Sequence, residues 1–377
     1  MRFPEFSGEW EKFRNDSLFN VVSEKNKGKQ ITSVLSASQT DGMVSRDSLG
    51  IDIKFEEDSI KNYKIVREGD YVIHLRSFQG GFAFSDRVGV CSPAYTILRP
   101  TQQISYGFLK PFFMSNKFID SLRLVTYGIR DGKSISVEEW LKLSTSLPSV
   151  EEQKKISAFL SLLDERIATQ IKIIEKLESL IRGISNSLLY ADNGTSVRIG
   201  DILKERVEKT KVNNQHVVLS STVKGIFSQR EYFSKDIASE NNVGYKVIRL
   251  HDVVLSPQNL WMGNINYNDK FDIGIVSPSY KIFSIADGYD KRFIAAMLKT
   301  HRALYNYMLV SEQGASVVRR NLNMEAFEQL VFKMPPIDKQ REIGNAISAL
   351  RSRLELAVRV KTAYEKQKQW LLTEMFI

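Results

Sequence analysis

The stretch LPSVEEQKKISAFLSLLDERIATQIKIIEKLESLIRGISNSLL, Leu147–Leu189, decides the architecture of this chain. Pro148 and the acids that follow it are typical of a first helical turn, where proline loses no hydrogen bond and acids meet the positive end of the helix dipole. Apolar residues then recur in steps of four and three, with one gap at Gln170 that Ile171 can cover. This heptad seam predicts a long helix that buries one face against a partner helix.

A second copy of the stretch supplies that partner. MPPIDKQREIGNAISALRSRLELAVRVKTAYEKQKQWLLTEMF begins at Met334 and aligns with the first stretch at an offset of 187 residues, with Pro335 against Pro148 and Gln340 against Gln153. Two like helices, each preceded by a globular stretch, imply a tandem duplication. The residues that we expect at the interface of the helix pair are Ile156, Leu160, Leu163, Ile167, Ile174, Leu177, Ile343, Ile347, Leu350 and Leu354.

The stretches before the two helices repeat each other as well. YKIVREGDYVI, from Tyr63, matches YKVIRLHDVVL, from Tyr245, and RVGVCSPAYTIL matches DIGIVSPSYKIF. Alternating apolar residues predict strands in these segments, with turns at the two Ser-Pro pairs. A helix is expected after Pro111, running toward Gly128.

The duplication predicts a mixed α/β fold with two similar globular domains joined by two long antiparallel helices in a coiled coil, related by a pseudo-two-fold axis. The expected boundaries are a first globular domain at residues 1–147, a central helix at 148–190, a second domain at 191–334 and a C-terminal helix at 335–377.

Composition favours an acidic partner. The chain has 377 residues, 42% of them hydrophobic and 26% charged, with a formal net charge of +9 and a pI of about 9.3. Such a charge favours nucleic acid ahead of a membrane surface. The single cysteine, Cys91, excludes a disulfide framework. With no signal-peptide pattern and no apolar run of the ~20 residues that span a bilayer, we expect a cytoplasmic protein without a membrane role.

A search for catalytic chemistry finds only near-motifs. GIRDGKS, from Gly128, has three residues between its glycines, whereas a phosphate-binding loop needs four. The Ser92-Pro93 and Ser277-Pro278 turns lack the second proline of the loop that holds a flipped adenine in amino-methyltransferases, and the four histidines are scattered. We therefore expect no catalytic residue, no metal and no cofactor on this chain.

Two pairs of loops favour DNA binding instead. Gln and Asn can pair in bidentate fashion with adenine and Arg with guanine, while Lys and Arg also neutralise phosphates. The loop FQGGFAFSDR, from Phe78, answers SPQNLWMGN, from Ser256, and a later basic loop follows in each domain. The residues that we expect to bind DNA are Arg46, Arg76, Gln79, Arg87, Arg130, Lys133, Arg230, Gln258, Asn259, Trp261, Arg319 and Arg320.

The chain resembles the DNA-specificity (S) subunit of type I restriction-modification systems. The resemblance is carried by LPSVEEQKKISAFLSLLDERI and MPPIDKQREIGNAISALRSRL, with support from RFPEFSGEWE near the N-terminus and the SPSY turn. It implies two target-recognition domains, each reading one half of a bipartite DNA sequence, and an antiparallel helix pair that sets their spacing. It also implies double-stranded DNA, two modification (methyltransferase) subunits and restriction (motor and nuclease) subunits as partners. S-adenosylmethionine and ATP with Mg would bind those subunits, so this chain would be a non-catalytic part of an adenine-N6 methyltransferase and site-specific deoxyribonuclease complex.

Two other readings of the residues stay open. One is a protein-interaction scaffold in which two adaptor domains sit on a coiled coil; the basic charge and the Gln, Asn and Arg loops count against it. The other is a free-standing adenine methyltransferase or nuclease, which the failed motif search disfavours.

Overall fold

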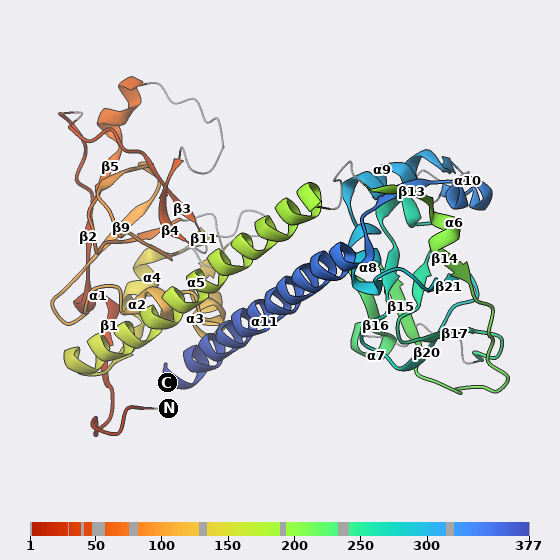
Figure 1. Ribbon diagram of the computed structural model, residues 1–377. Helices are drawn as coiled ribbons and strands as arrows, with labels where there is room; N and C mark the ends of the chain where they lie inside the picture. The colour runs from red at the N-terminus through yellow and green to blue at the C-terminus, as the bar shows by residue number, and fades with distance from the viewer. Residues whose placement is uncertain are drawn as a thin grey trace. The chain divides into compact units, whose positions relative to one another are not determined.

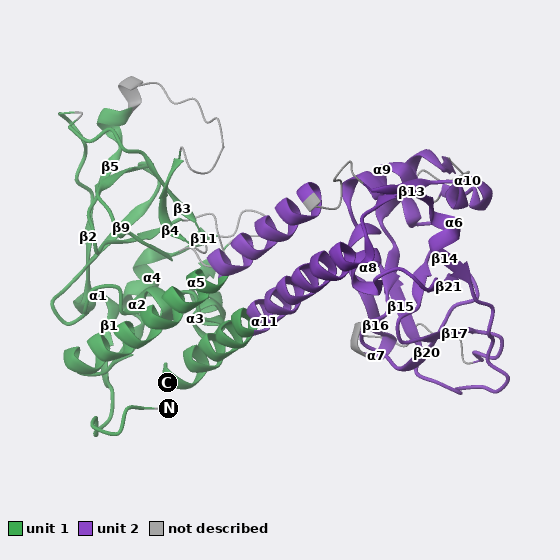
Figure 2. Ribbon diagram, in the orientation of Figure 1, with its two compact units in different colours: residues 1–170, 360–377 green, residues 171–359 purple. Residues whose placement is uncertain are grey.

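A computed structural model describes residues 2–28, 30–38, 41–46, 57–74, 82–127, 134–188, 194–232, 241–313 and 320–376 (Figure 1). The chain forms two compact units, and each contains part of both long helices (Figure 2). Unit 1 is Met1–Gln170 with Val360–Ile377, and unit 2 is Ile171–Arg359. The fold is mixed α/β, as the sequence predicts.

The two long helices are α5 (Val150–Leu188) and α11 (Ile337–Met375), each 39 residues in length. Both start just after a proline, and the Ser149 hydroxyl accepts a hydrogen bond from the Glu152 amide at 3.3 Å. Within unit 1 the chain directions of the two helices oppose each other. Lys368 of α11 donates to Asp164 of α5 at 2.5 Å, and Arg166, further along α5, donates to Tyr364, which comes earlier in α11.

Unit 1 is built on one four-stranded antiparallel sheet with the order β2–β9–β6–β7. Its strands are β2 (Phe19–Val22), β9 (Thr96–Pro100), β6 (Tyr71–Ile73) and β7 (Phe82–Phe84). Four antiparallel strand pairs surround it: β1 (Glu11–Arg14) with β12 (Ser144–Leu147), β3 (Leu35–Ser38) with β4 (Gly42–Ser45), β5 (Lys64–Val66) with β8 (Gly89–Cys91), and β10 (Thr126–Tyr127) with β11 (Ser134–Ile135). The short helices are α1 (Asn15–Leu18), η2 (Glu57–Asn62), α2 (Leu109–Phe113), α3 (Asn116–Ser121), η3 (Leu122–Val125) and α4 (Val137–Lys142).

Unit 2 repeats this topology strand for strand. Its four-stranded sheet has the order β14–β21–β18–β19, formed by β14 (Leu203–Glu205), β21 (Lys281–Ile285), β18 (Val253–Leu255) and β19 (Ile265–Tyr267). The matching pairs are β13 (Thr195–Arg198) with β24 (Val331–Met334), β15 (Leu219–Thr222) with β16 (Gly225–Ser228), β17 (Lys246–Arg249) with β20 (Ile273–Val276), and β22 (Ser311–Gln313) with β23 (Arg320–Leu322). The short helices are α6 (Ile199–Ile202), α7 (Gln229–Tyr232), η5 (Leu260–Met262), α8 (Lys291–Met297), α9 (His301–Leu309) and α10 (Met324–Glu328).

The repeat extends to single contacts. Gly89 and Gly274 hold the same place, and a Cβ at either would lie 2.5 or 2.4 Å from the leucine that packs on it, Leu35 or Leu219. Both Ser-Pro segments are turns between strands, as the sequence predicts, and each closes with a hydrogen bond from the tyrosine amide to the serine carbonyl, at 3.0 Å in unit 1 and 3.1 Å in unit 2. The scaffolds of the two units therefore match in individual contacts as well as in strand order.

Each core joins its sheet to the long helices of the same unit. In unit 1, the aromatic cluster around Phe82, Phe113 and Trp140 continues into Ile156 of α5 and Leu371 of α11. In unit 2 the corresponding cluster contains Ile343 and Ile347 of α11. Because the helices complete the two cores, each globular part needs them to bury its apolar surface.

The two Gln residues that align in the sequence hold the helix starts. Gln153 is almost fully buried; its amide donates to the Pro148 carbonyl at 3.0 Å and accepts from the Ser105 amide at 2.8 Å. Gln340, also buried, makes the same two bonds at the start of α11, at 2.8 and 3.0 Å. Each Gln thus ties a helix start to the loop after its sheet.

Two local expectations were wrong. The helix expected from Pro111 toward Gly128 is broken, because the Ser115 hydroxyl caps a new helix by accepting from the Phe118 amide at 3.2 Å. Further along α5, Gln170 stays on the half-buried side, and Ile171 is 39% exposed. Ile171 does not replace Gln170, because a one-residue shift turns a side chain by about 100° around the helix.

Candidate nucleic-acid interface

The residues that we expect at the interface of the helix pair are buried or half-buried, and several of them pack in the cores of their own units. Ile156, Leu160, Leu163, Leu177, Ile343 and Ile347 are buried, and Ile167, Ile174, Leu350 and Leu354 are half-buried. Polar side chains interrupt the seam in α11 at Lys361 and Lys368. Lys361 pairs with Glu365 at 2.9 Å, and Lys368 pairs with Asp164, so both keep a charged partner.

Seven of the twelve residues that we expect to bind DNA lie within the part of the chain that the structure describes. The other five, Arg76, Gln79, Arg130, Lys133 and Arg319, lie outside the described residues. The hairpins β10–β11 and β22–β23 flank two of those segments, at matching places in the two units. Tyr127, at the end of β10, is 58% exposed.

In unit 1, Arg46 and Arg87 have different partners. Arg46 follows β4; its guanidinium donates to the Ser36 hydroxyl at 3.1 Å and lies 5.8 Å from the centre of the Tyr63 ring. Arg87 pairs with the neighbouring Asp86 at 2.7 Å, and its hydrogen bond lowers the pKa of that carboxyl. Both partners of this pair are more than half exposed, where an ion pair contributes at most about 1 kcal/mol. Arg87 is therefore free to exchange Asp86 for a phosphate.

In unit 2 three of the predicted residues meet, although 62 positions separate the first and last. The Arg320 amide donates to the Gln258 carbonyl at 3.2 Å. The Arg320 guanidinium lies over the indole of Trp261, 4.7 Å from the ring centre, and Gln258 is exposed beside them. We call Gln258, Trp261 and Arg320 the reading cluster.

The reading cluster holds unused hydrogen-bond donors. Nε of Arg320 and Nε1 of Trp261 are both buried, and neither has a partner among the residues that the structure describes. Stacking on a tryptophan face orients a guanidinium and favours it by about 1–2 kcal/mol when it is partly desolvated. An arginine held in this way keeps its planar fork ready for a bidentate acceptor.

The two remaining candidates in unit 2 are Asn259 and Arg230. Asn259 shapes the loop through its backbone, since its carbonyl accepts from the amides of Met262 and Asn264 at 3.1 and 3.2 Å. Arg230 lies on the short helix α7 and is exposed.

Sequence reasoning missed the side chains that position this loop. Asn264 and Asn266 are buried and bind Ser221 of β15: the Ser221 hydroxyl donates to Asn264 Oδ1 at 2.9 Å and accepts from Asn266 at 2.7 Å. Lys299 donates to the Gly263 carbonyl at 2.7 Å. The alternation Asn264-Ile265-Asn266 at a strand start was the available signal, since polar side chains on the inner face of a strand need buried partners.

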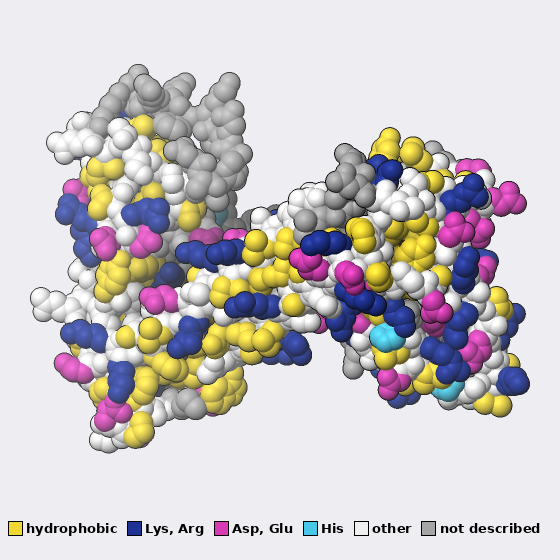
Figure 3. Space-filling view, in the orientation of Figure 1, with side chains coloured by type: hydrophobic (Ala, Val, Ile, Leu, Met, Phe, Trp, Pro, Cys, Tyr) yellow, Lys and Arg dark blue, Asp and Glu magenta, His cyan; other side chains and the backbone are white. Residues whose placement is uncertain are grey.

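The face drawn in Figure 3 carries both signs of charge. Figure 3 shows Lys and Arg side chains over the visible face of unit 2, with acidic side chains between them. Within the described ranges no cluster of His, Cys, Asp and Glu could hold a metal ion. No helix in the described part of the chain is both long and apolar enough to cross a bilayer.

The architecture defines a class of protein: two copies of one α/β scaffold, each completed by two long helices, with polar and aromatic residues in the described loops. Residues 7–179 match the model of the family described as "Type I restriction modification DNA specificity domain". For that part of the chain, the resemblance to the specificity subunits of type I restriction-modification systems is confirmed.

Solved structures share the fold over the whole chain. The crystal structure of the type I restriction-modification system S subunit from M. genitalium is 14% identical, with 100% of this chain and 99% of that chain covered and a TM-score of 0.62. A structure from work on complex assembly and conformational transition of the type I R-M system is also 14% identical, with 99% and 98% covered and a TM-score of 0.52.

Proposed function

We propose that this chain reads a bipartite DNA target, one half-site with each unit, and directs adenine methylation and cleavage by partner subunits. The observation that carries the proposal is the repeated scaffold with unlike loops. The β-strand order and the buried Gln contacts coincide in the two units, whereas the loop after β18 carries Gln258 and Trp261 and its counterpart carries Gln79 and Phe78. A shared scaffold with different contact residues suits two readers of different sequences.

The reading cluster in unit 2 suits recognition in the major groove. An arginine fork binds O6 and N7 of guanine in bidentate fashion, and Gln binds N6 and N7 of adenine. Arg320 stacks on Trp261, so little side-chain freedom remains to be lost on binding. In unit 1, Arg46 and Arg87 would contact phosphates or guanines.

The long helices would set the distance between the two half-sites. The opposite directions of α5 and α11 in unit 1, together with buried or half-buried seam residues in both units, support one antiparallel coiled coil. Two similar units on such a pair would present pseudo-equivalent surfaces to two copies of a modification subunit, with restriction subunits completing the complex. S-adenosylmethionine and ATP with Mg would bind the partners.

The test is methylation mapping with the chain and its modification subunits assembled. We expect one bipartite target with two different half-sites. Arg320→Lys keeps the charge but loses the fork, so it should relax specificity at one guanine of one half-site, by about 1–3 kcal/mol per base pair. Arg353→Lys, an exposed site on α11, is the matched control and should leave the target unchanged.

The same complex separates this proposal from a protein-interaction scaffold. DNA affinity should fall linearly on a plot of log K against log salt, with a slope of about −0.9 per phosphate contact. A continuous target, or simultaneous change of both half-sites in Arg320→Lys, contradicts the proposal. Absence of salt-dependent DNA binding in the assembled complex favours the scaffold.

A further inference from the structure

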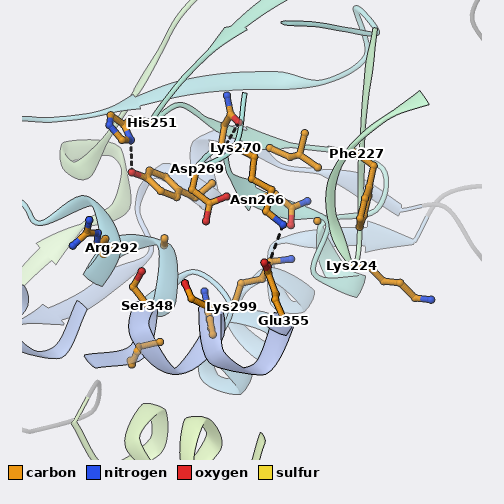
Figure 4. A pocket seen from close by; sticks show the side chains of 18 of the residues that line it. Lys224, Phe227, His251, Asn266, Asp269, Lys270, Arg292, Lys299, Ser348 and Glu355 are labelled. Atoms are coloured by element: carbon orange, nitrogen blue, oxygen red, sulfur yellow. Dashed lines mark hydrogen bonds and ion pairs between the residues drawn. The ribbon is translucent and has the colours of Figure 1, made fainter. Parts of the chain in front are cut away.

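Unit 2 contains a cleft that the proposed function does not use. Its volume is about 630 Å³, within the range of roughly 300–1,000 Å³ that is typical of small-molecule sites. The β15–β16 turn, the loop after β19, α8 and α11 form its walls (Figure 4). Asn266 and Asn268, both buried, line it together with the ring of Tyr267 and with Ser348 of α11.

The lining of this cleft is cationic. Lys270, Arg292, Lys299 and Arg351 line it against two acids, Asp269 and Glu355, and a further lysine, Lys224, extends away from the cavity in Figure 4. The balance without Lys224 is four cations to two acids, a net charge of +2. Lys270 and Glu355 pair with each other at 3.1 Å, so the excess charge resides mainly on the other three cations.

Two of these cations are partly buried without an acidic partner in contact. Lys299 donates only to carbonyls, of Gly263 at 2.7 Å and Val223 at 3.3 Å. Burial, with the Arg351 charge second, lowers the pKa of Lys299 to about 8. Burial also lowers the pKa of Arg351, although Asp269 and Glu355 oppose that shift. Within the described part of the chain, no hydrogen bond or ion pair joins the Arg351 side chain to another residue.

The corresponding positions of unit 1 indicate whether the fold of unit 2 depends on these cations. At the offset that aligns Gln340 with Gln153, Arg351 corresponds to Asp164 of unit 1. The helix-capping residues Thr300 and Ser115 correspond at an offset of 185 residues, which places Met114 opposite Lys299. Unit 1 thus forms the same strand order with an acid and a methionine at these places. Folding does not require the two cations, so their desolvation is a cost that a bound anion would offset.

We propose that this cleft binds a phosphorylated small molecule, with its phosphate groups held by Arg351, Lys299 and Arg292. The fork of Arg351 suits a phosphate oxygen pair, and the Ser348 hydroxyl offers a further donor. The volume leaves room for a diphosphate and an attached ring beside Tyr267. The site is independent of base reading and is found only in unit 2 among the described residues.

Isothermal titration of the full-length chain tests the site with two probes, inorganic pyrophosphate and adenosine diphosphate. We expect saturable binding of pyrophosphate with a Kd below about 1 mM. At a hundred times Kd, the unfolding temperature of unit 2 should rise by roughly 5–10 °C. Tighter binding of adenosine diphosphate would place the ring in the cleft as well, and equal binding would mean that phosphate alone is recognised; both support the site.

Arg351→Gln and Arg353→Gln are the matched variants, since both residues lie on α11 but only Arg351 lines the cleft. Arg351→Gln should lose binding at least tenfold and, without ligand, should unfold at the same or a higher temperature than the native chain. Arg353→Gln should bind as the native chain does. Equal binding by Arg351→Gln and the native chain, or no saturable binding by the native chain, overturns the proposal. A rise of the unfolding temperature with a DNA duplex, without any binding of pyrophosphate, overturns the proposal too. None of these outcomes depends on the bipartite DNA target.

Discussion

Removing one heptad from each long helix should shorten the gap between the DNA half-sites. The contacts of Asp164 with Lys368 and of Arg166 with Tyr364 define which levels of α5 and α11 face each other in unit 1. Continued along the helices, this register places residues 168–174 of α5 opposite residues 357–363 of α11. Deleting both segments removes seven residues from each helix and leaves every remaining seam pair opposite its former partner.

The magnitude follows from helix geometry. Seven residues at a rise of ~1.5 Å shorten the pair by about 10.5 Å, and the remaining helix turns by only about 20°. At about 3.4 Å per base pair, the gap should shrink by at most about 3 base pairs. The loops after β18 and in the reading cluster are untouched, so each half-site should keep its sequence.

Methylation sequencing measures the gap and the two half-site sequences in one experiment. The DNA comes from cells that carry the double-deletion variant with its modification subunits. Deletion of residues 168–174 alone is the control, because it puts the two seams out of register and should prevent assembly. An unchanged gap in the double deletion, or new half-site sequences with the old gap, would refute the idea that the helix pair sets the distance between the half-sites.

Three further outcomes concern stability. Gln153→Leu leaves buried backbone groups at the start of α5 unpaired and should cost about 2–4 kcal/mol in urea unfolding of unit 1; a loss below 1 kcal/mol would mean that water replaces the amide. Asp70→Ala strips the bidentate partner, at 2.9 Å, from Arg99 and should cost about 3 kcal/mol, whereas Asp16→Ala, in an exposed pair, should cost less than about 1 kcal/mol. Because burial lowers the pKa of Lys299 to about 8, below its unfolded value of ~10.4, the unfolded chain binds more protons between these pH values. Stability should therefore rise by up to about 3 kcal/mol across that window, and Lys299→Met should abolish the rise in urea midpoints measured from pH 7.5 to 10.5; a parallel rise in the variant would contradict this assignment.

Local chemistry explains where sequence reasoning failed. The break at Ser115 depends on a hydroxyl that competes with helix continuation, and the apolar periodicity on both sides hides such a cap. The prediction that Ile171 covers the gap at Gln170 considered the hydrophobicity of the residue and not its direction around the helix axis. That direction decides which residue faces the partner helix.

The sequence by itself determined the duplication, the two long helices and the strand segments, because periodicity and internal alignment are properties of the chain order. It also predicted Gln258, Trp261 and Arg320 as contact residues. Only the tertiary structure decided that these three side chains meet, that Lys299 and Arg351 share a cleft, and that Gln153 and Gln340 bind the loops of their own units. Those contacts join residues far apart in sequence, and nothing in the local pattern of either partner specifies the distance between them in the folded chain.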